Sequence, residues 1–264
     1  MDSCSEAADF LAQLRFNRCT EVDCPVQIRP QDIASGYAIQ DSLVRRFLER
    51  YGGHVIGYKI ACTNESAQKL LNTDAPVFGR LLTAFVHPSP ALLKGDDFAI
   101  LGIEAEFAFV ISQDVPTVGV QQTAETIINY VERMVPAIEL VGHRFSDWGK
   151  FDAPLLISDN AVHQAWIAGT ASDEWRDLDL SEHTVQLIVN GEVKAIGSGA
   201  NVLGHPLNAL AWLANELPTW GHALKAGNIV TTGTCIDVYT AKPGDKIRAD
   251  FGTLGSAEVS FNES

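Results

Sequence analysis

Two glutamates separated by one residue stand inside an otherwise apolar segment of the chain. Residues 103–110 are predicted to form a β-strand, in which alternate side chains point to the same face. Glu104 and Glu106 then share one face. Burying two like charges side by side is costly unless a cation or a proton compensates them. The alternative is a solvent-exposed strand edge, and the pattern alone leaves both interpretations open.

A third acid, Glu139, lies in the short apolar run 136–141, which is typical of a core strand. Three such acids suit a hard cation with oxygen ligands, such as Mg²⁺ or Mn²⁺, with water and substrate completing the octahedron. Motifs of histidine-rich transition-metal sites are missing, since the sequence has neither H-x-H nor H-E-x-x-H.

The elements that must position these acids are mostly short strands. Asn190-Gly191 predicts a two-residue hairpin turn, because both residues accept positive φ values. Strands and helices do not alternate regularly, so we expect an α+β fold with a mixed β-sheet core rather than a doubly wound sheet. The runs predicted as strands are residues 54–60, 103–111, 185–189 and 192–196, with four more between 228 and 261.

Apolar residues at helical spacing predict a small helical layer at the N-terminus. One stripe includes Ala7 and Leu14, and a second runs from Ile39 to Tyr51 before Gly52-Gly53. We therefore divide the chain into a helical N-terminal region, residues 1–52, and a β-rich catalytic domain, residues 53–264. Two further helices are predicted, one over residues 123–135 with Pro136 as its stop, and one over 206–217 before Pro218.

The chain is strongly acidic, with a formal net charge of −14 over 264 residues. Such a surface repels phosphate backbones and anionic lipid, so we expect neither nucleic acid nor a membrane as a partner. The five cysteines are irregularly spaced and form no C-x-x-C motif, which argues against a disulfide framework. No signal segment is visible, and a cytoplasmic protein is expected.

The order and spacing of several motifs resemble the hydratase/decarboxylase branch of the fumarylacetoacetate hydrolase superfamily. The resemblance covers most of the chain from residue 38 onward and implies the fumarylacetoacetate hydrolase C-terminal-like fold and, commonly, a homo-oligomer. The segments that carry it are Gly57-Tyr58-Lys59-Ile60 with Thr63, Ala75-Pro76-Val77-Phe78-Gly79, Ile103-Glu104-Ala105-Glu106, Ala137-Ile138-Glu139, Ser158-Asp159-Asn160-Ala161 and Val202-Leu203-Gly204-His205-Pro206.

The resemblance implies that Glu104, Glu106 and Glu139 bind Mg²⁺ or Mn²⁺, which chelates the 2-oxo and carboxylate oxygens of a small 2-oxo acid. It makes Lys59 the catalytic and substrate-binding cation. Thr234, in the turn Thr232-Gly233-Thr234, is expected to receive the substrate carboxylate. The same resemblance places Asp159 and Asn160 at the pocket border, where a role in a turn or a cap is an equal alternative.

Two departures from the family pattern bear on the reaction. Val77 stands where hydratases of this branch usually have an aspartate that takes part in proton transfer, and Val162 stands where a serine is common. The default is a metal-dependent lyase of the 2-keto-4-pentenoate hydratase type, from aromatic catabolism. A 4-oxalocrotonate-type decarboxylase is the runner-up, and a non-catalytic partner subunit is the third interpretation. Hydrolysis of an acylpyruvate is less favoured, because no clear histidine–glutamate pair precedes the E-x-E motif.

Overall fold

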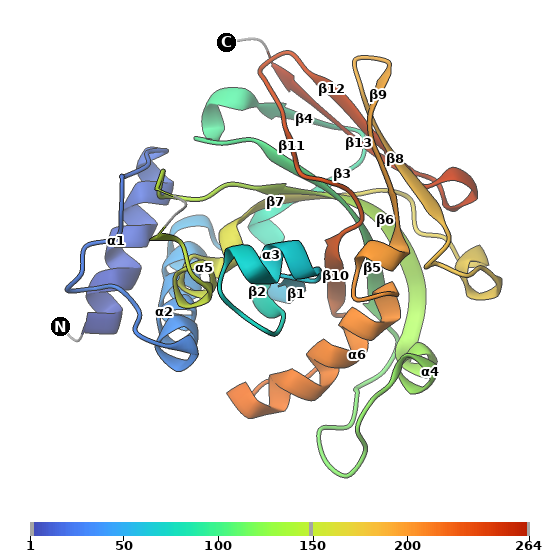
Figure 1. Ribbon diagram of the computed structural model, residues 1–264, viewed down its shortest axis with the longest axis horizontal. Coiled ribbons are helices and arrows are strands. Elements are labelled where there is room, and N and C mark those ends of the chain that lie inside the picture. The colour runs from blue at the N-terminus through green and yellow to red at the C-terminus, as the bar shows by residue number, and fades with distance from the viewer. Residues whose placement is uncertain (1–2, 148–149, 263–264) are drawn as a thin grey trace.

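Two β-sheets dominate the computed structural model, which describes residues 3–147 and 150–262 (Figure 1). The larger sheet has the strand order β2-β1-β10-β5-β6-β7-β3, with β11 paired to β5. The smaller sheet has the order β4-β13-β12-β8-β9. The strands are β1 Val55–Ala61, β2 Val77–Leu82, β3 Val86–Pro88, β4 Ala91–Lys94, β5 Gly102–Ile111, β6 Val131–Val141, β7 His163–Ala168, β8 Thr184–Val189, β9 Glu192–Ser198, β10 Ile229–Thr234, β11 Tyr239–Thr240, β12 Lys246–Asp250 and β13 Ser256–Asn262.

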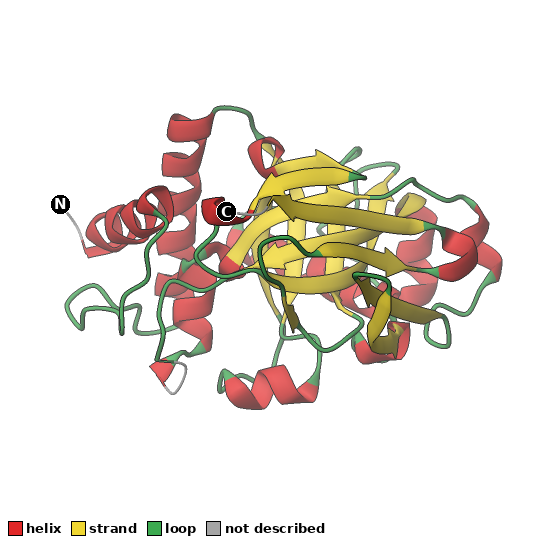
Figure 2. Ribbon diagram, turned by 90° about the horizontal axis from the view of Figure 1, so that it is seen from above, coloured by secondary structure: helices red, strands yellow, loops and turns green. Residues whose placement is uncertain are grey.

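The longer helices lie outside the sheets (Figure 2). Two of them, α1 and α2, pack against each other at the N-terminal side of the molecule (Figure 1). The helices are α1 Ser3–Asn17, α2 Ile33–Tyr51, α3 Glu65–Leu70, α4 Ala124–Ile127, α5 Ala153–Ser158 and α6 Pro206–Glu216. Within the described part of the chain, no helix combines the length and the apolar character needed to cross a membrane.

Most of the predicted elements are confirmed. The two N-terminal helices form, and Gly52, with a φ of 74°, ends α2 as expected. The hairpin of β8 and β9 turns at Asn190 and Gly191, which both have positive φ. All four strands predicted near the C-terminus are present as β10 to β13, and α6 begins at Pro206 with His205 as its cap.

The helix predicted over residues 123–135 is wrong. Only one helical turn, α4, forms after the cap Thr123, and a 3₁₀ turn then leads into the long strand β6. Pro136 lies inside this strand, where its carbonyl accepts a hydrogen bond from the Gly169 amide. Apolar residues on both faces of β6 are buried, and such a continuous run satisfies helical and strand spacing alike. Residues 131–141 form a strand because they pair with β5 along its whole length.

Hydrogen bonds tie the helical layer to the larger sheet. The buried Gln40 amide, on α2, donates to the carbonyls of Phe78 in β2 and Ile157 in α5. Arg80 in β2 reaches back to the Gln40 side chain and pairs with Asp41 at 2.7 Å. Apolar residues of α1 and α2 belong to the same hydrophobic core as the strands. The helices therefore brace the edge of the sheet that carries β1 and β2.

Candidate functional site

The three glutamates meet at the centre of the larger sheet. Glu104 and Glu106 project from β5, and the antiparallel register places Glu104 directly opposite Glu139 of β6. Carboxylate oxygens of all three residues lie within 4.8 Å of one another. Glu106 and Glu139 are fully buried, whereas Glu104 is partly exposed. The sheet thus gathers three acids around one point, at a separation that a single cation can bridge.

These carboxylates are poorly compensated by the protein itself. Burial raises the pKa of Glu139 to about 8, against the attraction of Lys59. Burial, together with repulsion from the other two acids, also raises the pKa of Glu106. Within the described residues, Glu106 Oε1 is buried without a hydrogen-bond partner. Hard oxygen donors with an unsatisfied buried atom fit a divalent cation such as Mg²⁺ or Mn²⁺.

Lys59 is the cation beside the acids. Its side chain projects from β1 and is buried, with Nζ 3.3 Å from Glu139 Oε2 and 3.1 Å from the Ala161 carbonyl, to which it donates a hydrogen bond. Burial alone would lower the pKa of Lys59, but attraction by Glu139, Glu104 and Glu106 outweighs it and raises the pKa. Lys59 therefore stays protonated and offers a fixed positive charge.

A strained turn at residues 160–162 holds Lys59 in place. Asn160, Ala161 and Val162 have φ values of 51°, 49° and 54°, which L-residues seldom adopt in succession. The side-chain amide of Asn160 fixes the turn to β2. Its Oδ1 accepts a hydrogen bond from the main-chain N–H of Arg80 at 2.7 Å, and its Nδ2 donates to the Arg80 carbonyl at 3.0 Å. Gly79 allows this close approach, because an added Cβ would lie 2.6 Å from the Asn160 carbonyl oxygen.

Two further residues orient the glutamates, and the sequence did not indicate their roles. His163 Nδ1 lies 2.7 Å from Glu139 Oε1, and Thr231 donates a hydrogen bond to Glu106 Oε2. Burial, followed by repulsion from Lys59, holds the pKa of His163 well below its usual value, so its ring is neutral and shares one hydrogen bond with Glu139. The only signal for His163 in the sequence is its position two residues after the Ser158-Asp159-Asn160-Ala161 motif.

Asp159 forms a buried ion pair with Arg144. Its Oδ1 lies 3.5 Å from Arg144 Nε, and both side chains are almost completely buried. Burial raises the pKa of Asp159 to about 6, against the attraction of Arg144 and Arg15. With the Asn160 amide bound to the main chain of Arg80, these contacts give both residues structural partners. Their predicted role in substrate binding stays a prediction.

A cavity of about 370 Å³ opens beside the acids and is lined by both Lys59 and Glu104. A second hollow of about 270 Å³ shares Glu104 and includes Thr234, from the predicted Thr-Gly-Thr turn. The Thr234 hydroxyl donates to the Ile236 carbonyl at 2.8 Å. Gly233 is required in this turn, because its φ is 103° and a Cβ would collide with Thr63. Two hollows thus meet at Glu104.

The model of the fumarylacetoacetate (FAA) hydrolase C-terminal family matches residues 54–262. The chain belongs to the fumarylacetoacetate hydrolase family. It is 32% identical to a 2-keto-4-pentenoate hydratase of Paraburkholderia xenovorans over 88% of this chain and 85% of that protein. It is also 32% identical to a 4-oxalocrotonate decarboxylase of Pseudomonas putida, over 86% of this chain and 85% of that protein.

Solved structures agree with the family assignment and with the α+β fold expected from the sequence. The 4-oxalocrotonate decarboxylase from Pseudomonas putida G7, complexed with magnesium and adipate, superposes with a TM-score of 0.90 at 27% identity. The match covers 98% of this chain and 97% of that one. A fumarylpyruvate hydrolase from Pseudomonas aeruginosa has a TM-score of 0.59 at 15% identity, which shows a shared fold alone.

Val77, the residue that departs from the family pattern, begins β2 and is buried opposite Ala61 of β1. It supplies no group that exchanges a proton. Val162, the other departure, ends the strained turn and lines the 370 Å³ cavity. Both positions are apolar here, so any proton transfer in this cavity depends on other side chains.

Proposed function

We propose that the chain is a metal-dependent lyase of small 2-oxo or 2-hydroxydienoic acids, of the 2-keto-4-pentenoate hydratase type. One observation carries the proposal: three carboxylates converge beside a protonated, buried Lys59 at one end of a cavity. Family membership and the relatives, which are named as hydratases and decarboxylases, support the reaction class.

In this proposal Glu104, Glu106 and Glu139 hold a divalent cation, Mg²⁺ or Mn²⁺. The bound cation would polarise the 2-oxo group and stabilise the negative charge that develops on it. Magnesium and calcium occur in solved structures of the 4-oxalocrotonate decarboxylase from Pseudomonas putida G7, which supports a divalent metal of this class. The hydrogen bonds from His163 and Thr231 fix two of the carboxylates, so the site is ordered before any ligand enters.

Lys59 then acts as a cation and a proton donor rather than as a base. Its raised pKa keeps Nζ charged at neutral pH, which suits it to bind the substrate carboxylate. Thr234, in the adjoining hollow, is proposed to contact the same carboxylate through its hydroxyl. Asp159 and Asn160 are proposed to act at the pocket border by holding the turn against which Lys59 rests.

Hydration of 2-hydroxypenta-2,4-dienoate needs a group that accepts a proton from water. The enol hydroxyl loses a proton, C3 and C5 each gain one, and C4 receives the hydroxyl of water. Burial lowers the pKa of His143, which lines the cavity and is therefore neutral at pH 7. We assign this proton acceptance to His143, since the usual aspartate is replaced by Val77.

Decarboxylation of a 4-oxalocrotonate-type acid is the second candidate. It needs fewer protein groups, because a polarised 2-oxo group already accepts the electron pair left by carbon dioxide. The apolar Val77 and the likeness to the decarboxylase structure favour it. The third candidate is a non-catalytic subunit that binds metal and partners an active relative.

We further propose that residues 1–52 form a supporting helical region and residues 53–264 the catalytic domain. Residues 1–2, 148–149 and 263–264 lie outside the described residues. The contacts of Gln40 and Arg80 make this support direct, since they brace the strand pair that presents Lys59. A homo-oligomer and a cytoplasmic location remain expectations from the sequence.

The proposal is tested by following the ultraviolet absorbance of 2-hydroxypenta-2,4-dienoate and 4-oxalocrotonate with protein from which metal has been removed. We expect turnover to appear on addition of Mg²⁺ and to be lost in Lys59→Met. Measuring released carbon dioxide separates decarboxylation from hydration. Metal binding without turnover of either acid would favour the non-catalytic subunit, and turnover that persists in chelator would refute the metal-dependent reaction.

A further inference from the structure

The cavity beside the acids is polar at one end and apolar over the rest of its wall. Lys59 and Glu104 mark the polar end, and His143 and Thr240 add two uncharged polar groups. Aliphatic side chains make up most of the remaining lining: Leu70, Leu71, Ile100, Val141, Leu156, Val162 and Val238. A ligand that places its charge at the acids would extend its other end among hydrocarbon groups.

Lys59 is the single lysine or arginine in the described lining of this cavity. It is already engaged by Glu139 and the Ala161 carbonyl at the polar end. Arg144, which follows His143 in the chain, turns instead to the Gly142 carbonyl and to Asp159. No described cation is therefore left to pair with a negative group at the far end of the cavity.

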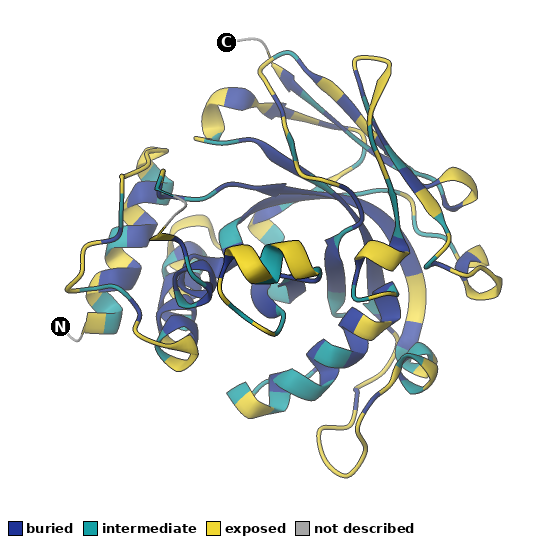
Figure 3. Ribbon diagram, in the orientation of Figure 1, coloured by how far each residue is buried: buried dark blue, intermediate teal, exposed yellow. Residues whose placement is uncertain are grey.

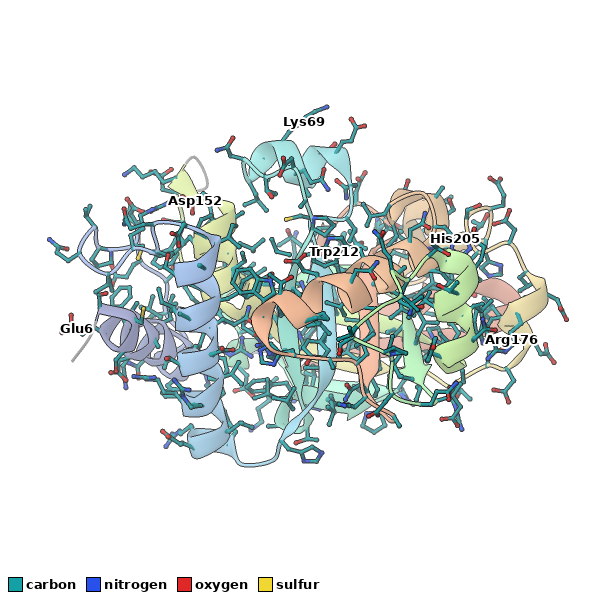
Figure 4. The ribbon with its side chains drawn as sticks, turned by 90° about the horizontal axis from the view of Figure 1, so that it is seen from below. Glu6, Lys69, Asp152, Arg176, His205 and Trp212 are labelled. Atoms are coloured by element: carbon teal, nitrogen blue, oxygen red, sulfur yellow. The ribbon has the colours of Figure 1, made fainter. Side chains whose placement is uncertain are left out.

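The neighbouring lysine of α3 does not supply that charge either. Lys69 points away from the molecule (Figure 4), its side chain is 79% exposed, and its ammonium lies 3.1 Å from Glu65. The adjoining hollow around Thr234 likewise has no lysine or arginine in its described lining, and it carries the acid Asp237. Both spaces that meet at Glu104 thus disfavour a second anion.

The rim of the cavity is apolar and exposed. Leu70, at the end of α3, is 61% exposed, and Val238 is 51% exposed. Helix α3 has no buried residue, so it covers the site without belonging to the core (Figure 3). Exposed aliphatic side chains that surround a cavity gain contact area when an apolar ligand enters.

We infer that the substrate carries one carboxylate, bound at the Lys59 end, and a short uncharged hydrocarbon tail that lies among the aliphatic residues. A dicarboxylic 2-oxo acid would place its second carboxylate among aliphatic side chains, with no described cation in the cavity lining to pair with it. This inference rests on the proposed function and narrows its substrate class to monocarboxylic acids. It also favours hydration of a dienoate over decarboxylation of a dicarboxylate.

An opposite role for the apolar wall is physically reasonable. A carboxylate that loses its hydration in an apolar space is destabilised, which promotes its departure as carbon dioxide. That arrangement requires the dicarboxylate to be turned over as efficiently as the monocarboxylate, or more efficiently. The two roles therefore predict different orders of kcat/KM for the monocarboxylate and the dicarboxylate. Binding of acids that do not react measures the preference for the tail alone, without the chemistry of the reaction.

The test measures binding of 2-oxopentanoate and 2-oxoadipate to the Mg²⁺-loaded protein by calorimetry, alongside kcat/KM for 2-hydroxypenta-2,4-dienoate and 4-oxalocrotonate. We expect the monocarboxylates to be preferred by at least tenfold, on the order of the discrimination produced by an unpaired buried polar group. Equal or tighter binding of 2-oxoadipate would overturn the inference, as would failure of both acids to bind. A retained preference without turnover would refute only the proposed reaction.

A charge added at the rim provides the matched test. Leu70→Arg places a cation at an exposed position outside the catalytic groups, and Leu70→Gln is the uncharged control. We expect the ratio of 2-oxoadipate affinity to 2-oxopentanoate affinity to be at least fivefold higher in Leu70→Arg than in Leu70→Gln. No difference between the variants for 2-oxoadipate would count against the tail lying on this rim.

Discussion

Replacing Glu106 by glutamine should stabilise the metal-free protein and abolish its response to magnesium. Glu106 is completely buried, its Oε1 has no hydrogen-bond partner among the described residues, and Oε2 accepts from Thr231. Glutamine has nearly the same shape, and its amide oxygen can keep the contact to Thr231. The substitution therefore removes an ionisable carboxyl group from the site while leaving the packing almost unchanged.

The magnitude follows from the cost of crowding buried acids. A pKa shift of one unit corresponds to about 1.4 kcal/mol, and the neighbouring Glu139 is raised from 4.5 to about 8. Allowing for relaxation and partial protonation, Glu106→Gln should raise the free energy of unfolding by roughly 1–3 kcal/mol in chelator. Mg²⁺ at a hundred times its Kd adds about 2.7 kcal/mol to the wild type, and the variant should gain almost none of this.

Thermal unfolding in EDTA and in saturating Mg²⁺ measures both effects. For a chain of this length, 2.7 kcal/mol corresponds to a rise in Tm of roughly 5–10 °C. Glu49→Gln, the same substitution on the exposed surface of α2, is the control and should behave like the wild type. A Glu106→Gln protein that is less stable than wild type in EDTA, or that keeps the full Mg²⁺ shift, would refute the reasoning.

Three further predictions concern protons and positioning. In EDTA, the free energy of unfolding should fall as the pH rises from 6.5 to 8, because the raised pKa of Glu139 makes the folded state hold more protons than the unfolded chain. Denaturant unfolding at steps of half a pH unit measures this fall, and a flat profile would contradict the prediction. His163→Leu removes the hydrogen bond to Glu139 and should weaken Mg²⁺ binding about 10–100-fold, as measured by calorimetry. The control His163→Gln should be less affected, and an unchanged Kd in His163→Leu would be the contrary result. Asn160→Ala should lower the free energy of unfolding in urea by about 1–3 kcal/mol, because the buried main-chain amide and carbonyl of Arg80 lose their partner. It should also lower kcat, and a stable variant with full kcat would argue against a turn that positions Lys59.

Local sequence patterns predicted the elements of the site better than its geometry. The alternation along residues 103–110 placed Glu104 and Glu106 on one face, because strand periodicity is a property of neighbouring residues. That Glu139 lies opposite Glu104 depends on the register of β5 and β6, which no local pattern encodes. The residue types suggested a shared cation, and the resemblance to a family assigned all three acids to one metal site.

The helix predicted over residues 123–135 illustrates the same limit. A continuous apolar run has no single period, so strand and helix are equally consistent with its composition. Pairing with β5 resolves the choice, and the paired residues are twenty or more positions apart in sequence. The roles of His163 and Thr231 were missed for a related reason, since each meets its glutamate only through the arrangement of strands.

The glutamates and the turn at residues 160–162 are placed for function at the expense of stability. Three acids lie close together on the larger sheet, two of them fully buried, and a turn of three residues with positive φ places the Ala161 carbonyl against Lys59. Each feature costs stability in the metal-free protein, and neither improves the packing of the core. A cation bound by the three carboxylates would offset this repulsion. The larger sheet therefore supplies the rigidity that a repulsive site requires, which explains why the acids lie on its two longest strands rather than on loops.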